Sequence, residues 1–252
     1  MRFASLGSGS KGNGLVVTAG ETKLLIDCGF TVKETVARLE RLDLKPSDLT
    51  AVLVTHEHGD HIKGVGPLAR KYKLPVYLTP GTLVTGKLGE VPTVQTIEGY
   101  QSFQIGDVFV TPVAVPHDAR EPAQFIFQYQ DFRLGVLTDL GSISEHVIFH
   151  YQNCHALVLE ANHDPQMLAQ GPYPYSLKKR VAGNWGHLSN AQAENFLARI
   201  FSDQLRHVVI AHISQQNNSL DIVEQQFSAW QNQLETLYYA CQDQGFHWLD
   251  LN

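Results

Sequence analysis

Short apolar or alternating segments recur along the chain, and Gly, Pro, Asp or Asn residues bound each of them. Runs of about four to eight residues with this patterning are typical of β-strands. The predicted strands cover Arg2–Leu6, Leu15–Ala19, Lys23–Asp27, Ala51–Thr55, Val76–Thr79, Val108–Val115, Gln124–Tyr129, Arg133–Asp139, Ala156–Glu160, Val208–Ala211 and Phe246–Leu251. The chain is therefore expected to be rich in strands.

Four segments instead repeat their apolar residues at the spacing of a helix. Two of them open with a capping box, in which Thr31 is followed by Glu34 and Ser189 by Gln192. The predicted helices begin at Thr31, run from about His61 to Tyr72, begin at Ser189, and run from about Ser219 through Leu237 with the aromatic residues in the core. Strands interleaved with a few helices predict a layered α/β fold.

Length and composition bound the class of protein. The chain has 252 residues and is 43% apolar, which is ample for a sizeable core. No linker, repeat or low-complexity tract divides it, so we expect one domain over residues 1–252. No apolar run approaches the roughly 18–20 residues that span a bilayer, and the first residues lack a signal-peptide pattern. We therefore expect a cytoplasmic protein without a membrane segment.

Net charge and cysteine content argue against further classes of protein. The net charge of −6 gives no general attraction to polyanions, so any nucleic acid must be held by a local patch. The cysteines at 28, 154 and 241 form no CxxC pair, which indicates neither a disulfide framework nor a thiolate metal site. Histidine is the exception to an ordinary composition, because 12 residues are about twice the average usage.

The histidines concentrate after the apolar run Ala51–Val54, in the string Thr55-His56-Glu57-His58-Gly59-Asp60-His61. An HxHxDH pattern is expected by chance on the order of once in a thousand chains of this length. Imidazole nitrogens and carboxylate oxygens suit zinc, manganese or iron, and two ions about 3.5–4 Å apart would use the whole string. An exposed histidine-rich turn is the alternative. Further candidate ligands follow predicted strands, namely His117, Asp139 and His212.

At these positions the chain resembles the metallo-β-lactamase superfamily across essentially its whole length. The residues that carry the resemblance stand in the superfamily's order, namely Asp27, the string from His56 to His61, His117, Asp139 and His212. The resemblance implies a four-layer αββα sandwich with the metals at one edge. It implies that the first ion is bound by His56, His58 and His117, the second by Asp60, His61 and His212, and both by the bridging Asp139. Asp27 is implied to be a supporting acid that braces the loop without binding metal.

The implied centre would hold two divalent cations, with zinc as the first expectation and manganese or iron as alternatives. A water between two cations loses its proton near neutral pH and becomes a hydroxide placed for attack. We assign Asp60 the additional role of orienting that hydroxide. True β-lactamases lack a bridging carboxylate such as Asp139, so antibiotic hydrolysis is disfavoured. The expected reaction is hydrolysis of a phosphoester, a thioester or a lactone.

His187 lies just ahead of the helix that Ser189 caps, where exposed amides and the helix dipole favour an anion. A protonated imidazole there suits a phosphate oxygen or a departing alkoxide. The segment resembles the ribonuclease Z branch, which implies that Glu160 orients His187. Leu188 is inserted between His187 and Ser189, and no segment resembles the tRNA-gripping arm, so the resemblance implies phosphodiester chemistry without tRNA specificity. The alternative is a pair of polar residues at a helix boundary.

Two stretches are candidates for contact with the substrate. The glycine-rich loop Leu6–Gly14 offers amides, hydroxyls and one cation that can cradle a phosphate, although a flexible hairpin has the same composition. The basic run Lys178–Arg180 follows Tyr173 and Tyr175, which places cations near rings for base stacking, with a solvated turn as the alternative. The predicted substrate contacts are Ser8, Ser10, Lys11, Asn13, His163 and Lys178.

With these segments included, the chain most resembles the YycJ/WalJ-like group of compact metallo-β-lactamase-fold hydrolases, which is associated with nuclease activity on DNA. We expect a dinuclear phosphodiesterase, an exonuclease-like nuclease whose partner is a nucleic acid or a small phosphodiester. A glyoxalase-II-like thioesterase or another small-ester hydrolase is the alternative, and it would share every metal ligand. A metal-binding scaffold or redox module without hydrolase activity is a third hypothesis. The sequence leaves open the native metal, DNA against RNA, exonucleolytic against internal cutting, and the oligomeric state.

Overall fold

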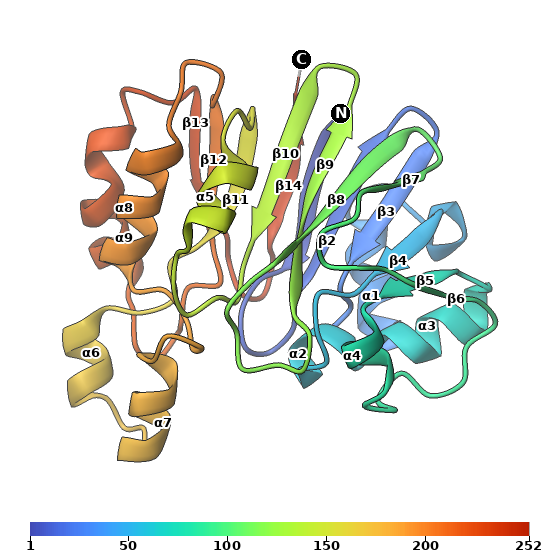
Figure 1. Cartoon of the computed structure of the whole chain (residues 1–252), viewed down its shortest axis with the longest axis horizontal. Coiled ribbons are helices and arrows are strands. Elements are labelled where there is room, and N and C mark those ends of the chain that lie inside the picture. Colours follow the sequence, from blue (N-terminus) through green and yellow to red (C-terminus); the bar gives the residue numbers. More distant parts are fainter. Residues whose placement is uncertain (252) are drawn as a thin grey trace. The chain divides into compact units, whose positions relative to one another are not determined.

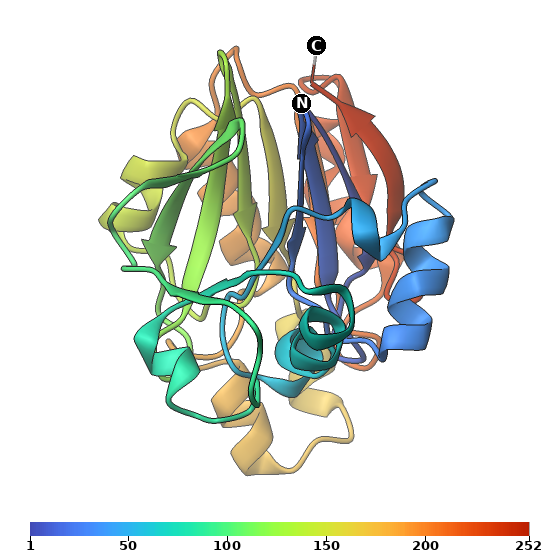
Figure 2. The same ribbon diagram turned by 90° about the vertical axis from the view of Figure 1, so that its right-hand side faces the viewer.

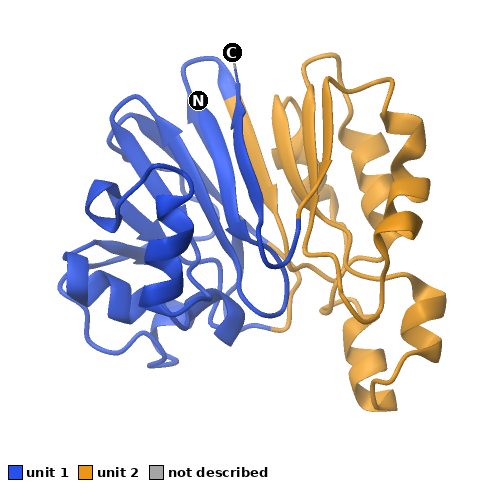
Figure 3. Cartoon of the chain, turned by 180° about the vertical axis from the view of Figure 1, so that it is seen from behind, with its two compact units in different colours: residues 1–114, 119–132, 241–252 blue, residues 115–118, 133–240 orange. Residues whose placement is uncertain are grey.

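The computed structural model describes residues 1–251, which fall into two compact units (Figure 3). Unit 1 comprises residues 1–114, 119–132 and the C-terminal residues from 241, and unit 2 comprises residues 115–118 and 133–240. None of the helices in the described part of the chain combines the length and the apolar character needed to cross a membrane.

The larger sheet of unit 1 has the strand order β14-β1-β2-β3-β4-β5-β6. Its strands are β1 (Arg2–Gly7), β2 (Gly14–Ala19), β3 (Thr22–Ile26), β4 (Ala51–Leu53), β5 (Val76–Leu78), β6 (Val94–Thr96) and β14 (Phe246–Asp250). Pairing is antiparallel from β14 to β3 and parallel from β3 to β6. The two ends of the chain meet at one end of this sheet, where the Leu251 amide donates to the Met1 carbonyl at 2.8 Å (Figure 2).

Helices cover one face of this sheet. They are α1 (Val32–Glu40), a 3₁₀ turn η1 (Pro46–Asp48), α2 (Gly59–Ile62), α3 (Val65–Tyr72) and α4 (Pro80–Leu83). Leu39 of α1 and Leu68 of α3 are fully buried in one core with Leu25 and Val52 of the sheet. The predicted capping box at Thr31 is present, and this explains why α1 begins there.

Three antiparallel strands complete unit 1: β7 (Phe103–Ile105), β8 (Val108–Ala114) and β9 (Ala123–Tyr129). Two hydrogen bonds tie these strands to the larger sheet. The Asp107 amide donates to Thr22 Oγ1 at 2.7 Å, and the Ala123 amide donates to the Thr55 carbonyl at 3.0 Å. The second bond fixes the chain where the histidine string begins.

Unit 2 is built on four parallel strands, β10 (Phe132–Leu137), β11 (Ala156–Glu160), β12 (His207–Ala211) and β13 (Thr236–Tyr239). Its helices are α5 (Glu145–Tyr151), α6 (Pro165–Gln170), α7 (Tyr175–Val181), α8 (Asn190–Ile200), α9 (Leu220–Phe227) and a 3₁₀ turn η2 (Ser228–Trp230). Figure 1 shows α5, α8 and α9 together beside this sheet, and the buried Tyr151 hydroxyl donates to the Val136 carbonyl at 2.6 Å. Parallel strands present their carboxyl ends at one edge, so residues that follow β10, β11 and β12 are neighbours.

Two expected helices differ from the structure. The segment from His61 to Tyr72 is divided into α2 and α3 at Gly64, whose amide donates to the Cys28 carbonyl at 2.7 Å. The helix predicted from Ser219 through Leu237 is wrong beyond Phe227, where a 3₁₀ turn and the strand β13 follow. Parallel pairing with β12, as in Val208 opposite Leu237, outweighs the helical spacing.

Three strands have no counterpart among the predicted ones, namely β6, β7 and β13. Each has only three or four residues, and β6 and β7 alternate weakly between buried and exposed positions. Such strands depend on a neighbouring edge more than on their own pattern.

We predict that Gly64→Ala lowers the free energy of unfolding by at least about 2 kcal/mol, because the added methyl group would lie 1.9 Å from the Phe30 carbonyl oxygen. Gly59→Ala is the matched control, since nothing lies within 4 Å of its methyl position, and its effect should stay within about 1 kcal/mol. Urea denaturation of the metal-free variants, followed by circular dichroism, measures both. Equal stabilities would contradict the proposed steric cause.

Candidate metal centre

The histidine string of unit 1 lies between the end of β4 and the first turn of α2. His56 and His58 are on the connecting loop, with His58 as the N-cap, while Asp60 and His61 are in the helix. The ring centroid of His56 lies 4.5 Å from that of His58 and 4.2 Å from that of His61. The strand-to-helix turn therefore gathers the imidazoles that the sequence predicted as ligands.

A buried carboxylate holds this turn in place. Asp27 follows β3 in the left-handed backbone region, with φ of 60°, and its Oδ1 accepts the Thr55 amide at 2.8 Å. Its Oδ2 lies 2.8 Å from the Thr55 hydroxyl and 2.8 Å from His61 Nδ1. The hydroxyl is 2.9 Å from His56 Nδ1. When both rings carry their proton on Nδ1, both present Nε2 as the ligating nitrogen.

Asn13 of the glycine-rich loop reaches the same turn. Its Nδ2 lies 3.2 Å from Asp60 Oδ2 and 3.0 Å from His61 Nε2, and its Oδ1 accepts the Gly9 amide at 2.8 Å. The sequence predicted Asn13 as a substrate contact, whereas the structure places its amide against two predicted metal ligands.

The rest of that loop packs against a residue near the C-terminus. The side-chain oxygen of Gln242 accepts the Lys11 amide at 3.0 Å, and a methyl group on Gly9 would lie 2.3 Å from it. Ser8 is buried, and its contact with substrate stays a prediction. Ser10 and Lys11 are exposed, so their contacts with substrate stay a prediction.

In unit 2, four acidic and imidazole side chains converge at the carboxyl edge of the parallel sheet. Asp139, Glu160, His187 and His212 each offer a ligand atom, and these atoms all lie within 4.8 Å of one another. Asp139 and His212 follow strand ends with φ of 59° and 52°. Left-handed backbone at non-glycine residues is a conformational strain that surrounding contacts must maintain, and it is concentrated at functional sites.

Glu160 is the centre of that group. Its Oε1 lies 2.7 Å from His187 Nδ1 and 3.0 Å from His212 Nδ1. Its Oε2 accepts the amides of Leu188 at 3.0 Å and Leu140 at 3.3 Å. Sequence reasoning anticipated the contact with His187 but missed the one with His212. The signal was the parallel register that pairs Glu160 with Ala211, the residue before His212.

The charges of this group are strongly coupled. Burial opposes ionisation of Glu160, but the His187 imidazolium and hydrogen bonds from His187 and His212 lower its pKa to about 2. Burial likewise opposes protonation of His212, but Asp139 and then Glu160 raise its pKa to about 10. The pKa of His187 is also raised, because Glu160 and Asp139 outweigh burial. Without metal, the carboxylates of this group thus favour the protonated form of both imidazoles.

His117 is the remaining predicted ligand. It is buried in unit 2, and its Nδ1 lies 3.0 Å from the Gly186 carbonyl oxygen, which it donates to in the Nδ1-protonated form. Its ring centroid lies 5.3 Å from that of His187. His117 therefore borders the Asp139 group within the same unit.

Two other predicted substrate contacts have structural partners. Lys178 donates from Nζ to the Ala169 carbonyl at 2.6 Å, which links α7 to the end of α6, and its contact with substrate stays a prediction. His163 is buried, its carbonyl accepts the Asn190 amide at 3.0 Å, and burial lowers the pKa of its ring. The predicted contact of His163 with substrate stays a prediction.

The donor chemistry of both units fits divalent metal ions. Each unit supplies imidazole nitrogens together with a carboxylate, the set that zinc, manganese and iron accept. Each also has a buried acid that orients the imidazoles, Asp27 in unit 1 and Glu160 in unit 2. The thiols are unsuited to this role, because burial raises the pKa of Cys28 to about 11 and of Cys154 to about 12.

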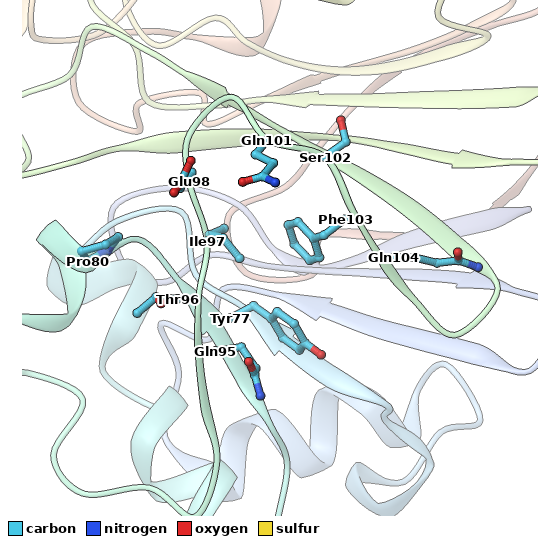
Figure 4. A pocket seen from close by; sticks show the side chains of 10 residues that line it. All are labelled: Tyr77, Pro80, Gln95, Thr96, Ile97, Glu98, Gln101, Ser102, Phe103 and Gln104. Atoms are coloured by element: carbon cyan, nitrogen blue, oxygen red, sulfur yellow. The ribbon is translucent and has the colours of Figure 1, made fainter.

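A separate hollow of about 400 Å³ lies in unit 1 between the edge strands β6 and β7 (Figure 4). The stacked rings of Tyr77 and Phe103, 5.5 Å apart, form part of its wall with Gln95, Gln101 and Gln104. The residues that line it include none of the predicted metal ligands. It is therefore distinct from the candidate metal centre.

Comparison with known proteins places the chain in a family. The family model described as a beta-lactamase superfamily domain matches residues 22–213. "Exodeoxyribonuclease YycJ" of Bacillus anthracis is 38% identical over 234 residues, which cover 90% of this chain and 88% of that protein. "Exodeoxyribonuclease WalJ" of Streptococcus pneumoniae is 35% identical, with 86% of this chain and 83% of that protein covered.

Solved structures agree on the fold. The metallo-beta-lactamase fold protein YhfI from Bacillus subtilis superposes with a TM-score of 0.75 at 16% identity over 98% of both chains. Zinc-bound PqqB from Methylobacterium extorquens gives a TM-score of 0.73 at 17% identity over the full length of both chains. The predicted fold class is therefore confirmed, and the chain belongs to the metallo-β-lactamase superfamily of metal-dependent hydrolases.

Proposed function

We propose that this chain is a dinuclear metal-dependent phosphodiesterase that degrades DNA as an exonuclease. The observation that carries the proposal is the 2.7 Å contact between His187 Nδ1 and Glu160 Oε1, beside Asp139. A thioester hydrolase expels a thiolate, which needs no proton from the protein, whereas an alkoxide leaving group needs an acid of this kind. The names of the two relatives, both exodeoxyribonucleases, support the same chemistry and add DNA as the substrate.

We propose that the predicted ligands serve one dinuclear centre, as the family resemblance implies. One ion would be held by His56, His58 and His117, the other by Asp60, His61 and His212, and both by Asp139. Zinc is the proposed metal, with manganese and iron as alternatives that the same donors accept. Bound as a pair, such cations supply a deprotonated water at neutral pH and neutralise charge on the phosphoryl oxygens.

The side chains of this protein would supply orientation and a proton. Asp60, whose Oδ2 lies 3.2 Å from Asn13 Nδ2, would orient the attacking oxygen. His187 is about one-fifth exposed, so it can reach a substrate while Glu160 fixes its ring. Glu160 and Asp139 raise the pKa of His187 against the opposing effect of burial, which favours the protonated ring, and Nε2 would give its proton to the leaving oxygen.

The substrate class is tested directly. Metal-loaded protein should cleave end-labelled DNA and bis(p-nitrophenyl) phosphate but not S-lactoylglutathione, because the proposed cations suit an anionic phosphodiester and not a neutral thioester group. Release of labelled mononucleotides from the DNA identifies exonucleolytic cutting. Thioester turnover without phosphodiester turnover would replace this proposal with the glyoxalase-II-like alternative.

We expect His187→Ala to retain its metal and to lose about 100-fold or more of its turnover of DNA, the usual contribution of a general acid. Hydrolysis of bis(p-nitrophenyl) phosphate should fall much less, because p-nitrophenolate leaves without a proton. His150→Ala is the matched control, because His150 is a partly exposed histidine on α5. The variant Asp139→Ala should lose at least one ion. Elemental analysis measures the bound metal, and steady-state rates measure turnover of each substrate. An equal loss of turnover on DNA and on bis(p-nitrophenyl) phosphate would argue against the acid role.

Metal uptake should release protons. The cation competes with the proton on His212, whose pKa is raised to about 10, so the apparent zinc affinity rises with pH up to that value. Between pH 6 and 8 we expect at least about one proton released per centre, that of His212. Calorimetry in buffers of different ionisation enthalpy counts these protons, and a pH-independent affinity would contradict the charge distribution described above.

A further inference from the structure

Beside His187, unit 2 carries an exposed aromatic ring. Trp185 is 62% exposed and stands two residues before His187. It borders a hollow of about 360 Å³ that is lined also by Ser176, Lys179, Arg180, Asn184 and Asp118.

Backbone contacts place the hollow next to the candidate metal centre. The Trp185 carbonyl accepts the Asp118 amide at 2.8 Å, and Asp118 follows the predicted ligand His117. The next carbonyl, that of Gly186, lies 3.0 Å from His117 Nδ1. One short loop thus contacts a predicted metal ligand and carries both the proposed acid and the exposed indole.

That loop is held on both sides. The His187 amide donates to the Val181 carbonyl at 2.9 Å, and the Ser142 hydroxyl donates to the Asn184 carbonyl at 3.1 Å. A methyl group on Gly141 would lie 2.3 Å from the Gly186 nitrogen, so the loop packs closely against its neighbour. Because the backbone under Trp185 is fixed before any ligand arrives, little ordering is needed on binding.

The charges around the hollow suit a phosphate. Lys179 and Arg180 come from the last turn of α7 and line the hollow together with Trp185. Arg180 donates from Nε to the Asp118 carboxylate, which orients the guanidinium while the η nitrogens remain as donors for another anion. Lys178, the cation that the sequence favoured, instead reaches the Ala169 carbonyl, so the basic run divides between two tasks.

We propose that this hollow is the subsite for an unpaired nucleotide adjacent to the phosphodiester that is cut. The base stacks on Trp185, and the phosphate of that nucleotide is bound by Lys179 and Arg180. Stacking requires an exposed base face, so the preferred substrate is a single strand or a frayed duplex end. The inference rests on the proposed nuclease function and adds the form of nucleic acid to it.

The test compares Trp185→Ala and Trp185→Phe with the metal-loaded wild-type protein on a single-stranded DNA oligonucleotide. We expect KM to rise about 10-fold to 100-fold in Trp185→Ala with kcat changed less than about threefold, and Trp185→Phe to lie close to wild type. Phe149→Ala is the matched control, because Phe149 is 71% exposed on α5 of the same unit. Its KM should not change.

An oligonucleotide whose terminal nucleotides are abasic keeps the phosphates and removes the base. On it, the wild-type protein and Trp185→Ala should have the same KM, and unequal values would overturn the stacking role. Wild-type cleavage of DNA with an unchanged KM in Trp185→Ala would overturn this inference and leave the proposed function standing. Failure of the wild-type protein to cleave any oligonucleotide would overturn the proposed function instead. Quenching of the Trp185 fluorescence by the oligonucleotide, lost in Trp185→Phe, supports the inference independently of turnover.

Discussion

The candidate site depends on two buried carboxylates, Glu160 and Asp27. Glu160 is fully buried, and four donors converge on it: two imidazoles and two backbone amides. In unit 1, the buried carboxylate of Asp27 is contacted by the Thr55 amide, the Thr55 hydroxyl and the His61 ring. A buried charge with its hydrogen bonds complete is tolerated, whereas one that loses its partners costs about 3–5 kcal/mol. Each carboxylate therefore fixes both the loops around it and the direction in which its imidazoles point.

The parallel sheet of unit 2 supplies the geometry that this network requires. Its strands end side by side, so Asp139, Glu160 and His212 meet although they are far apart in the sequence. The left-handed backbone at Asp139 and His212 turns each side chain back toward the edge. The hydrogen bonds that Glu160 accepts from Leu140 and Leu188 hold the two loops that carry Asp139 and His187. Fold and site are therefore stabilised by the same contacts.

The sequence predicted the centre better than its surroundings. Strands that end in a buried acid or histidine are visible as apolar runs, and the HxHxDH string is too dense to arise without a cause, so candidate ligands could be named one by one. The direction of a side chain is not visible in this way. The sequence does not show that Lys178 donates to the end of α6, or that Ser8 is buried. Likewise, the spacing from Phe227 to Leu237 fits a helix, but pairing with β12 makes its end a strand. Trp185 gave no signal, because an isolated tryptophan after a glycine and an asparagine has no pattern of its own.

The glycine-rich loop connects the beginning of the chain with its last strand. Gln242 accepts the Lys11 amide and donates to the Gly12 carbonyl, and Asn13 in turn meets Asp60 and His61. During translation, Asn13 and Asp60 leave the ribosome long before Gln242 is made. The loop that holds Asn13 against Asp60 therefore gains its contacts with Gln242 only at a late stage of synthesis, after the residues that it braces have been made.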